Sequence, residues 1–101
     1  RVTDQIVCRD GSGELRRMHA LSLIYVLREA DGLRQFRITQ ASLDALDVEV
    51  VAGSAFTSDV ERAVIKGLSA RLGPRVGIRI VRRAEIPPTA SGKHACVVSS
   101  L

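Results

Sequence analysis

The sequence is poor in aromatic residues and in cysteine, and each scarcity excludes a class of protein. It contains no tryptophan, one tyrosine and two phenylalanines, so the bases of a single-stranded nucleic acid would find little surface for stacking. Its two cysteines, Cys8 and Cys96, form no C-x-x-C pair and have no histidine at metal-site spacing, which predicts free thiols and no metal centre. No apolar run is long enough to cross a bilayer, and no stretch has the pattern of a signal peptide. We therefore expect a cytoplasmic protein with no membrane partner.

The remaining composition is that of a globular domain with a basic excess. The 101 residues are 46% hydrophobic and 26% charged, which predicts one domain with an aliphatic core. The net charge is +4, with thirteen arginines and two lysines. Because the arginines are scattered and mostly alternate with apolar residues, we expect no nucleic-acid partner; a nucleic-acid-binding domain would instead show strong salt-dependent binding. A diffuse positive field still attracts anionic ligands such as nucleotides.

Alternation and turn signals predict an α+β domain that begins with a β-hairpin. The expected elements before the second helix are strands over 4–9 and 14–17, a buried helix over 18–30, and an antiparallel pair of strands over 33–41 and 46–52. Phe36 and Ile38 are expected to face the core from the first strand of that pair. Leu46, Val48 and Val50 are expected to face it from the second.

The best-defined predicted element is a helix over Ser58–Leu72. Ser58 and Glu61 match the S-x-x-E capping box, and an apolar stripe follows at helical spacing. A strand over 76–82, with Val76, Ile78 and Ile80 inward, and a last strand over 95–98 complete the order. We therefore predict a single domain over 1–101, with a roughly three-stranded antiparallel or mixed sheet covered by two helices.

The segment 85–99, EIPPTASGKHACVVS, combines a stiff start with a positive charge. Pro87 and Pro88 block continued strand or helix pairing, small residues follow, and Lys93 precedes an apolar run. Such a loop presents an ammonium group to an anion outside its own domain, although most loop lysines are simply solvated. The segment is not a P-loop, because that motif requires glycine in place of Pro87 and serine or threonine in place of His94.

Three stretches together resemble the C-terminal domain of adenylate-forming enzymes, and most closely that of the phenylacetate–coenzyme A ligase branch. They are RVTDQIVCRDG, LRQFRITQ and EIPPTASGKHACVVS, and their order and spacing cover essentially the whole chain. The resemblance implies the mobile C-terminal domain of a larger AMP-forming acid–thiol ligase, so this part alone is expected to be inactive. The implied partners are an N-terminal adenylation domain of the same protein, a carboxylic acid substrate, and coenzyme A or carrier-protein pantetheine as acceptor. ATP with Mg²⁺ would be held mainly by the N-terminal domain.

The resemblance also assigns roles to five residues. Lys93 matches the catalytic loop lysine of acyl-adenylate formation, and Arg1 matches an arginine that contacts the nucleotide. Thr3 stands at the hinge position, where the family commonly has aspartate or lysine, and Asp4 keeps the acidic residue that follows. Gly11 matches a glycine that lines the thiol tunnel, or is simply a turn glycine. Because the chain begins inside this hinge motif, we expect residues 1–4 to be the remnant of a hinge in a longer protein.

A different class of function remains open beside this one. The chain would then be a stand-alone small α+β ligand-sensing or protein-interaction module. In that case we expect residues 89–93 to pack against the body of the domain itself.

Overall fold

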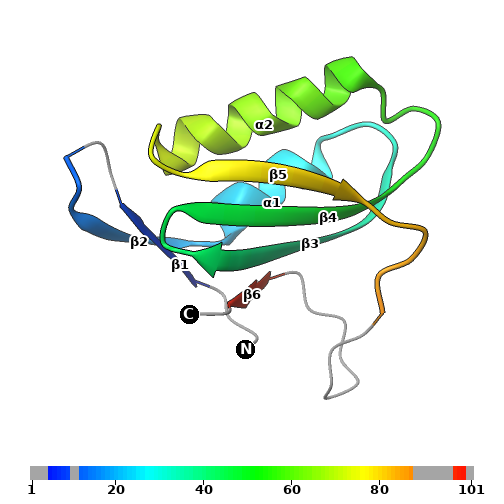
Figure 1. The fold of residues 1–101 in the computed structure, drawn as a ribbon. Coiled ribbons are helices and arrows are strands. Elements are labelled where there is room, and N and C mark those ends of the chain that lie inside the picture. The colour runs from blue at the N-terminus through cyan, green and yellow to red at the C-terminus, as the bar shows by residue number, and fades with distance from the viewer. Residues whose placement is uncertain (1–4, 10–11, 88–96, 100–101) are drawn as a thin grey trace.

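The computed structural model describes residues 5–9, 12–87 and 97–99. This part of the chain forms a hairpin, two helices and a larger sheet (Figure 1). The elements in chain order are β1 (Gln5–Arg9), β2 (Leu15–His19), α1 (Leu21–Arg28), β3 (Leu33–Ser42), β4 (Ala45–Ala52), α2 (Ser58–Leu72), β5 (Gly77–Arg82) and β6 (Val97–Ser99).

The larger sheet is mixed and has the strand order β5-β4-β3-β6, while β1 and β2 form a separate antiparallel hairpin. β3 and β4 are antiparallel neighbours, as predicted. β5 runs parallel to β4 because α2 carries the chain back across the sheet between them, and β6 runs parallel to β3. The predicted α+β class is confirmed, and β6 adds a fourth strand to the three main strands expected.

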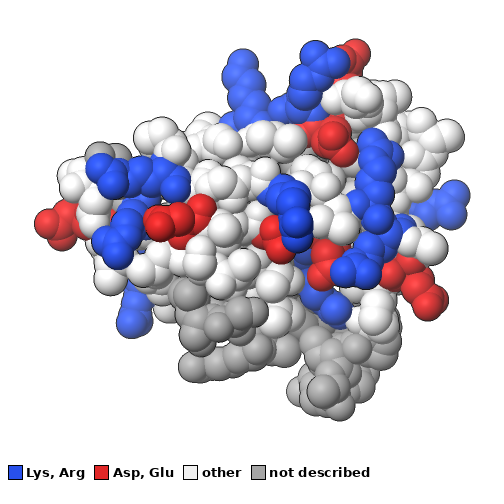
Figure 2. All heavy atoms as spheres, in the orientation of Figure 1, with Lys and Arg blue, Asp and Glu red and all other residues white. Residues whose placement is uncertain are grey.

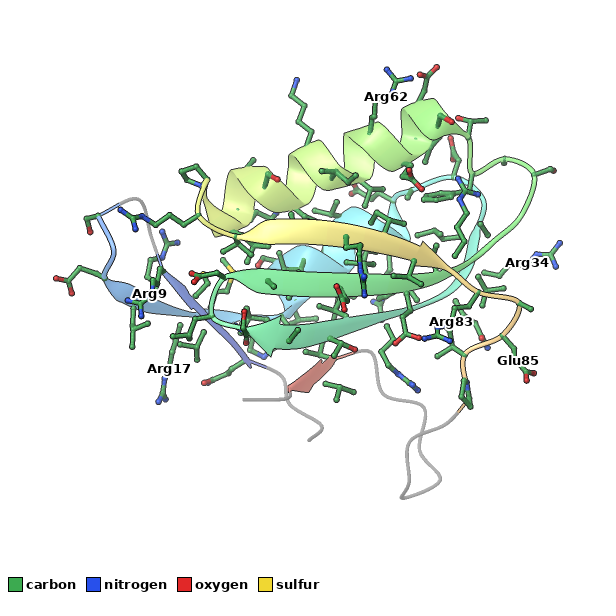
Figure 3. All side chains as sticks on the ribbon, in the orientation of Figure 1. Arg9, Arg17, Arg34, Arg62, Arg83 and Glu85 are labelled. Atoms are coloured by element: carbon green, nitrogen blue, oxygen red, sulfur yellow. The ribbon has the colours of Figure 1, made fainter. Side chains whose placement is uncertain are left out.

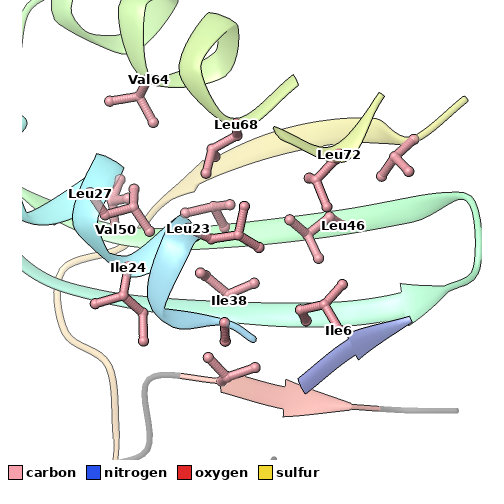
Figure 4. Packing of buried hydrophobic residues seen from close by; sticks show 14 of the residues in the cluster. Ile6, Leu23, Ile24, Leu27, Ile38, Leu46, Val50, Val64, Leu68 and Leu72 are labelled. Atoms are coloured by element: carbon pink, nitrogen blue, oxygen red, sulfur yellow. The ribbon is translucent and has the colours of Figure 1, made fainter. Parts of the chain in front are cut away.

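Both helices cover one face of this sheet, and aliphatic side chains fill the space between the layers (Figures 1 and 4). Ile38, Val48 and Val50 are fully buried from the sheet side, and Leu23 and Leu68 are fully buried from the helices. The predicted inward faces of the two central strands are therefore confirmed. Neither described helix has the length and apolar character needed to cross a membrane.

The first helix is shorter than the 18–30 predicted. Met18 and His19 belong to β2, where they pair with Ile6 and Gln5 of β1, and α1 begins only after Ala20. Met18, the first residue of the apolar run, belongs to the hairpin because Ile6, the cross-strand partner of Met18, is fully buried in the core. Tertiary packing therefore overrides the local preference for helix at this position.

The capping box predicted at the start of α2 does not form. The N-cap is Thr57, whose backbone is extended (φ −83°, ψ 172°) and whose hydroxyl accepts a hydrogen bond from the Val60 amide at 3.3 Å. Ser58 is already helical, and the Glu61 carboxylate pairs instead with the Arg82 guanidinium at 3.4 Å. Thr57 and Ser58 are both good N-cap residue types, and the backbone geometry selects the first.

One buried polar side chain connects the hairpin to the larger sheet. Gln40 of β3 is 2% exposed and points toward the core side of the sheet. Its Oε1 accepts a hydrogen bond from the Val7 amide at 3.2 Å, and its Nε2 donates to the carbonyl oxygens of Val7 and Ser42. Gln40 thus satisfies both backbone polar groups of Val7, which the β1–β2 pairing leaves on the side facing β3.

Candidate functional site

The segment 88–96, which carries Lys93, follows the stretch of chain that leaves β5. The last described residues of that stretch are held against the domain. Ile86 is buried, at 5% exposure, and holds the chain against the domain. The next residue, Pro87, is exposed, and its carbonyl oxygen accepts a hydrogen bond from Nη2 of Arg37 at 2.6 Å. Since Arg37 lies in the middle of β3, the start of the segment is tied to the centre of the sheet.

The far end of the same segment is tied to the same strand. Val97, the first residue of β6, is 3% exposed and pairs with Ile38 of β3. Arg37 and Ile38 are neighbours on β3, so the two described residues that bracket 88–96 are both held by adjacent positions of one strand. We call Arg37, Ile38, Pro87 and Val97 the loop base.

The residues to which the sequence assigned functional roles lie outside the described residues. This applies to Lys93, Arg1, Thr3, Asp4 and Gly11. The structure therefore leaves their roles as predictions, and it describes the scaffold on either side of them.

The sheet face opposite the helices carries ion pairs close to the loop base. Arg79 of β5 pairs with Asp47 of β4 at 3.2 Å, and Arg83 pairs with Glu49. Glu49 lies opposite Arg37 in the register of β3 and β4. Figure 3 shows Arg83 directed across this face, and Figure 2 shows basic and acidic side chains interleaved over it. Because carboxylates offset the arginines here, the described residues of this face form no continuous basic stripe that would follow a nucleic-acid backbone.

A groove lies between α1 and α2, away from the loop base. Its volume is about 360 Å³, which is at the small end of the range for ligand pockets. Gly67 allows the helices to approach closely, because a Cβ atom there would lie 3.0 Å from Cγ1 of Val26. Glu29, Asp31 and Arg71 supply its charged groups. The remaining lining residues are Ala30, Val60, Ala63 and Val64.

In the described part of the chain, no group of three or more histidine, cysteine, aspartate or glutamate side chains is placed to hold a metal ion. Cys8 is buried, and its Sγ contacts the Leu72 carbonyl oxygen at 3.8 Å.

No pattern in the sequence indicated the contact that Arg37 makes. Its position between Phe36 and Ile38 places it correctly on the outer face of a strand, as the alternation predicts. Its hydrogen-bond partner, Pro87, is fifty positions away in the chain, so no local pattern could connect the two. The groove between the helices was missed for the same reason, because it depends on how Gly67 and Val26 meet.

Comparison with known proteins identifies the family. A family model described as the CapK C-terminal domain matches residues 12–100, and no curated protein matches the chain. This finding corrects the family assignment made from the sequence: the match is to a CapK domain, which is a different family from the phenylacetate–coenzyme A ligase branch of adenylate-forming enzymes. The stretches on which that assignment rested are short, and two of them include residues outside the described part. The chain belongs to the CapK C-terminal domain family.

Proposed function

We propose that the chain acts as the C-terminal lid domain of an ATP-dependent, AMP-forming carboxylate ligase. In this role it supplies Lys93 for acyl-adenylate formation and then rotates for thioester formation. The proposal is about the reaction that the protein catalyses. The match to the CapK C-terminal domain family does not test that reaction. The observation that supports it best is the loop base, because the described residues on both sides of 88–96 are held by one strand, which suits the delivery of a charge from that segment to a separate domain.

Acyl-adenylate formation requires one positively charged group that can move into the reaction site. A carboxylate must approach the α-phosphate of ATP, and the two anions repel each other. An ammonium group between them offsets this repulsion and stabilises the charge that spreads onto the phosphate oxygens. A unit charge pair about 4 Å apart is worth roughly 1 kcal/mol in water and about 4 kcal/mol in a partly closed site, so the lysine is effective only when the two domains meet.

The remaining roles follow from the same proposal. Arg1 contacts the nucleotide, Thr3 and Asp4 form the hinge, and Gly11 lines the path of the acceptor thiol. The partners are the N-terminal adenylation domain, which holds ATP with Mg²⁺ and the carboxylic acid, and the pantetheine thiol of coenzyme A or of a carrier protein. Such a reaction draws on the ATP and coenzyme A pools of the cytoplasm, which is the compartment we propose.

The test is carboxylate-dependent exchange of pyrophosphate into ATP by the complete protein that contains this chain. Lys93→Ala should lower the exchange rate on the order of 10²–10³-fold, as expected for the loss of one preorganised donor. The same variant should still form thioester from a supplied acyl-adenylate. Lys66→Ala is the matched control, because Lys66 is the other lysine of the chain and is exposed on α2. Unchanged exchange in Lys93→Ala would remove the lysine from the reaction.

The groove between α1 and α2 favours a second candidate, a stand-alone ligand-sensing or protein-interaction module. Ala63 lies on its lining and is exposed on α2, so Ala63→Phe would fill the groove with little strain on the core. Under the first proposal this variant keeps normal exchange activity. If Ala63→Phe changed the activity of the complete protein and Lys93→Ala did not, that result would favour the second candidate.

A further inference from the structure

We infer that the groove between α1 and α2 is an interface between two copies of this chain. The inference goes beyond the proposed reaction and does not depend on it. The groove belongs to the layer of helices that covers one face of the larger sheet (Figure 1). A second copy seated on the helices leaves the opposite face of the sheet free.

The two ends of the groove carry opposite charges. At one end Arg71 folds back along α2, and its Nη1 donates a hydrogen bond to the Gly67 carbonyl oxygen at 3.0 Å. At the other end lies Asp31, which precedes Gly32, and a Cβ atom on Gly32 would meet the backbone of Phe56 just before α2 begins. The guanidinium and the carboxylate are therefore separated along the groove by about two turns of α2.

The charged groups of the groove have no ionic partners within the described part of the chain. The printed sequence places Glu29 and Asp31 at the end of α1, and both are exposed and form no ion pair with any described residue. The dipole of α1 is negative at this end, so two carboxylates here attract a cation. Arg28 is close in sequence but is not among the described residues that line the groove. Arg71 contacts a backbone carbonyl and keeps further N–H groups for an anion.

A second copy turned end for end supplies both missing charges. In an interface with two-fold symmetry the same surface of each copy meets the other, so every contact occurs twice. Arg71 of each copy then faces Glu29 and Asp31 of the other. A uniformly basic partner would be repelled at the Arg71 end, and a uniformly acidic partner would be repelled at the carboxylate end. The charges of the groove therefore favour a second copy as its occupant.

An exposed aromatic side chain beside the groove provides the shape that fills it. Tyr25 is 55% exposed, directly precedes Val26 of the groove lining, and lies one helical turn before Glu29. The lining is low at Ala63 and Gly67, so a neighbouring surface can approach closely. Tyrosine is enriched at interfaces because an apolar ring carries a polar tip. Tyr25 of each copy is therefore the side chain that we expect to enter the groove of the other.

The first experiment measures self-association of the complete protein by analytical ultracentrifugation. The unmodified protein should pass from monomer to dimer as its concentration rises, with a Kd in the micromolar range, because the helix faces form a small interface. The readout is mass and not turnover, so it is independent of the proposed reaction. A protein that stays monomeric at every concentration overturns the inference and leaves the groove to a different partner.

The second experiment reverses the charges at the two ends. Arg71→Glu and Asp31→Arg each place like charges face to face, and each should raise Kd at least about tenfold. An equal mixture of the two variants should recover the original affinity, as heterodimers only. In that mixture the new glutamate of one variant faces the new arginine of the other, and the native Arg71 and Asp31 face each other. Failure of the mixture to associate would overturn the inference.

Arg34→Glu is the matched control for the charge reversals. Arg34 is exposed on β3, its side chain points into solvent in Figure 3, and it does not line the groove. This variant makes the same change of charge as Arg71→Glu and should leave Kd unchanged. Equal losses of affinity in the two variants would mean that net charge alone governs association, which contradicts a specific interface.

A third set of variants tests the shape of the contact. Tyr25→Ala removes the inserted ring and Ala63→Phe fills the groove, so each should raise Kd about tenfold. The control is Leu15→Ala, because Leu15 is 58% exposed but lies on β2, outside the groove. Association that is unchanged in both Tyr25→Ala and Ala63→Phe belongs to another surface and overturns the inference. Equal losses in Leu15→Ala and Tyr25→Ala would show a non-specific hydrophobic contact and would overturn it as well.

Discussion

At the scale of single residues, the turn at Gly32 leaves no room for a side chain. Its φ angle is +80°, which side-chain-bearing residues rarely adopt, and its carbonyl accepts a hydrogen bond from the Gly53 amide at 2.7 Å. A Cβ atom at this position would overlap the Phe56 amide nitrogen and lie 2.7 Å from the Ala55 carbonyl carbon. Both obstacles are backbone atoms, so no side-chain rotation relieves them.

We therefore predict that Gly32→Ala lowers the free energy of unfolding by more than about 2 kcal/mol, because dihedral strain and overpacking add. The control is Gly73→Ala, which has a similar φ angle of +95° but no atom within 4 Å of the new methyl group. Its backbone (φ 95°, ψ 171°) lies in a region that is nearly confined to glycine, so the variant carries the dihedral strain without the overlap and should cost about 1–3 kcal/mol, less than Gly32→Ala. Urea denaturation of both variants measures the difference, and equal losses would show that the contact with residues 55 and 56 has no energetic weight.

At the scale of elements, the start of α2 provides a test of which residue caps the helix. Thr57→Ala should lower the free energy of unfolding by about 1 kcal/mol, because the Val60 amide loses its acceptor at 3.3 Å. Ser58→Ala should change it by less than about 0.5 kcal/mol, since an exposed helical serine has no such role. Thermal or urea unfolding compares the two variants, and a larger loss from Ser58→Ala would restore the capping box read from the sequence.

The central strands and the start of α2 show what the sequence could predict about this fold and what it could not. Period-two alternation correctly placed Ile38, Val48 and Val50 in the core, because one buried face leaves each strand only one acceptable register. The N-cap was wrong by one residue because Thr57 and Ser58 have similar local chemistry. Only the observed backbone angles separate them.

Non-local pairing accounts for the other differences. The assignment of Met18 to a strand depends on Ile6, and the loop base depends on the meeting of Arg37 with Pro87. Local periodicity carries no information about such contacts. For the candidate site, the sequence therefore indicated a loop with a lysine, and the structure added the strand that contacts the described residues on either side of that segment.

At the scale of the whole molecule, the hairpin and the four-stranded sheet behave as one body because their inner faces share a core. Ile6 and Cys8 of β1 are buried in the same cluster as Leu72 of α2. Gln40 adds a polar connection by bonding to both backbone groups of Val7 across the two sheets.

Replacement of Gln40 by leucine should therefore weaken the attachment of the hairpin more than the sheet itself. Gln40→Leu keeps the buried volume similar but leaves the Val7 N–H and C=O without their partner, which should cost about 1–3 kcal/mol. Gln35→Leu is the control, because Gln35 is exposed on the same strand. Urea denaturation gives the difference in the free energy of unfolding. Compared with the unmodified protein, Gln40→Leu should accelerate amide hydrogen exchange more at Val7 than at Ile38. Equal acceleration at both amides would mean that Gln40 supports the sheet as a whole and does not serve as the specific link to the hairpin.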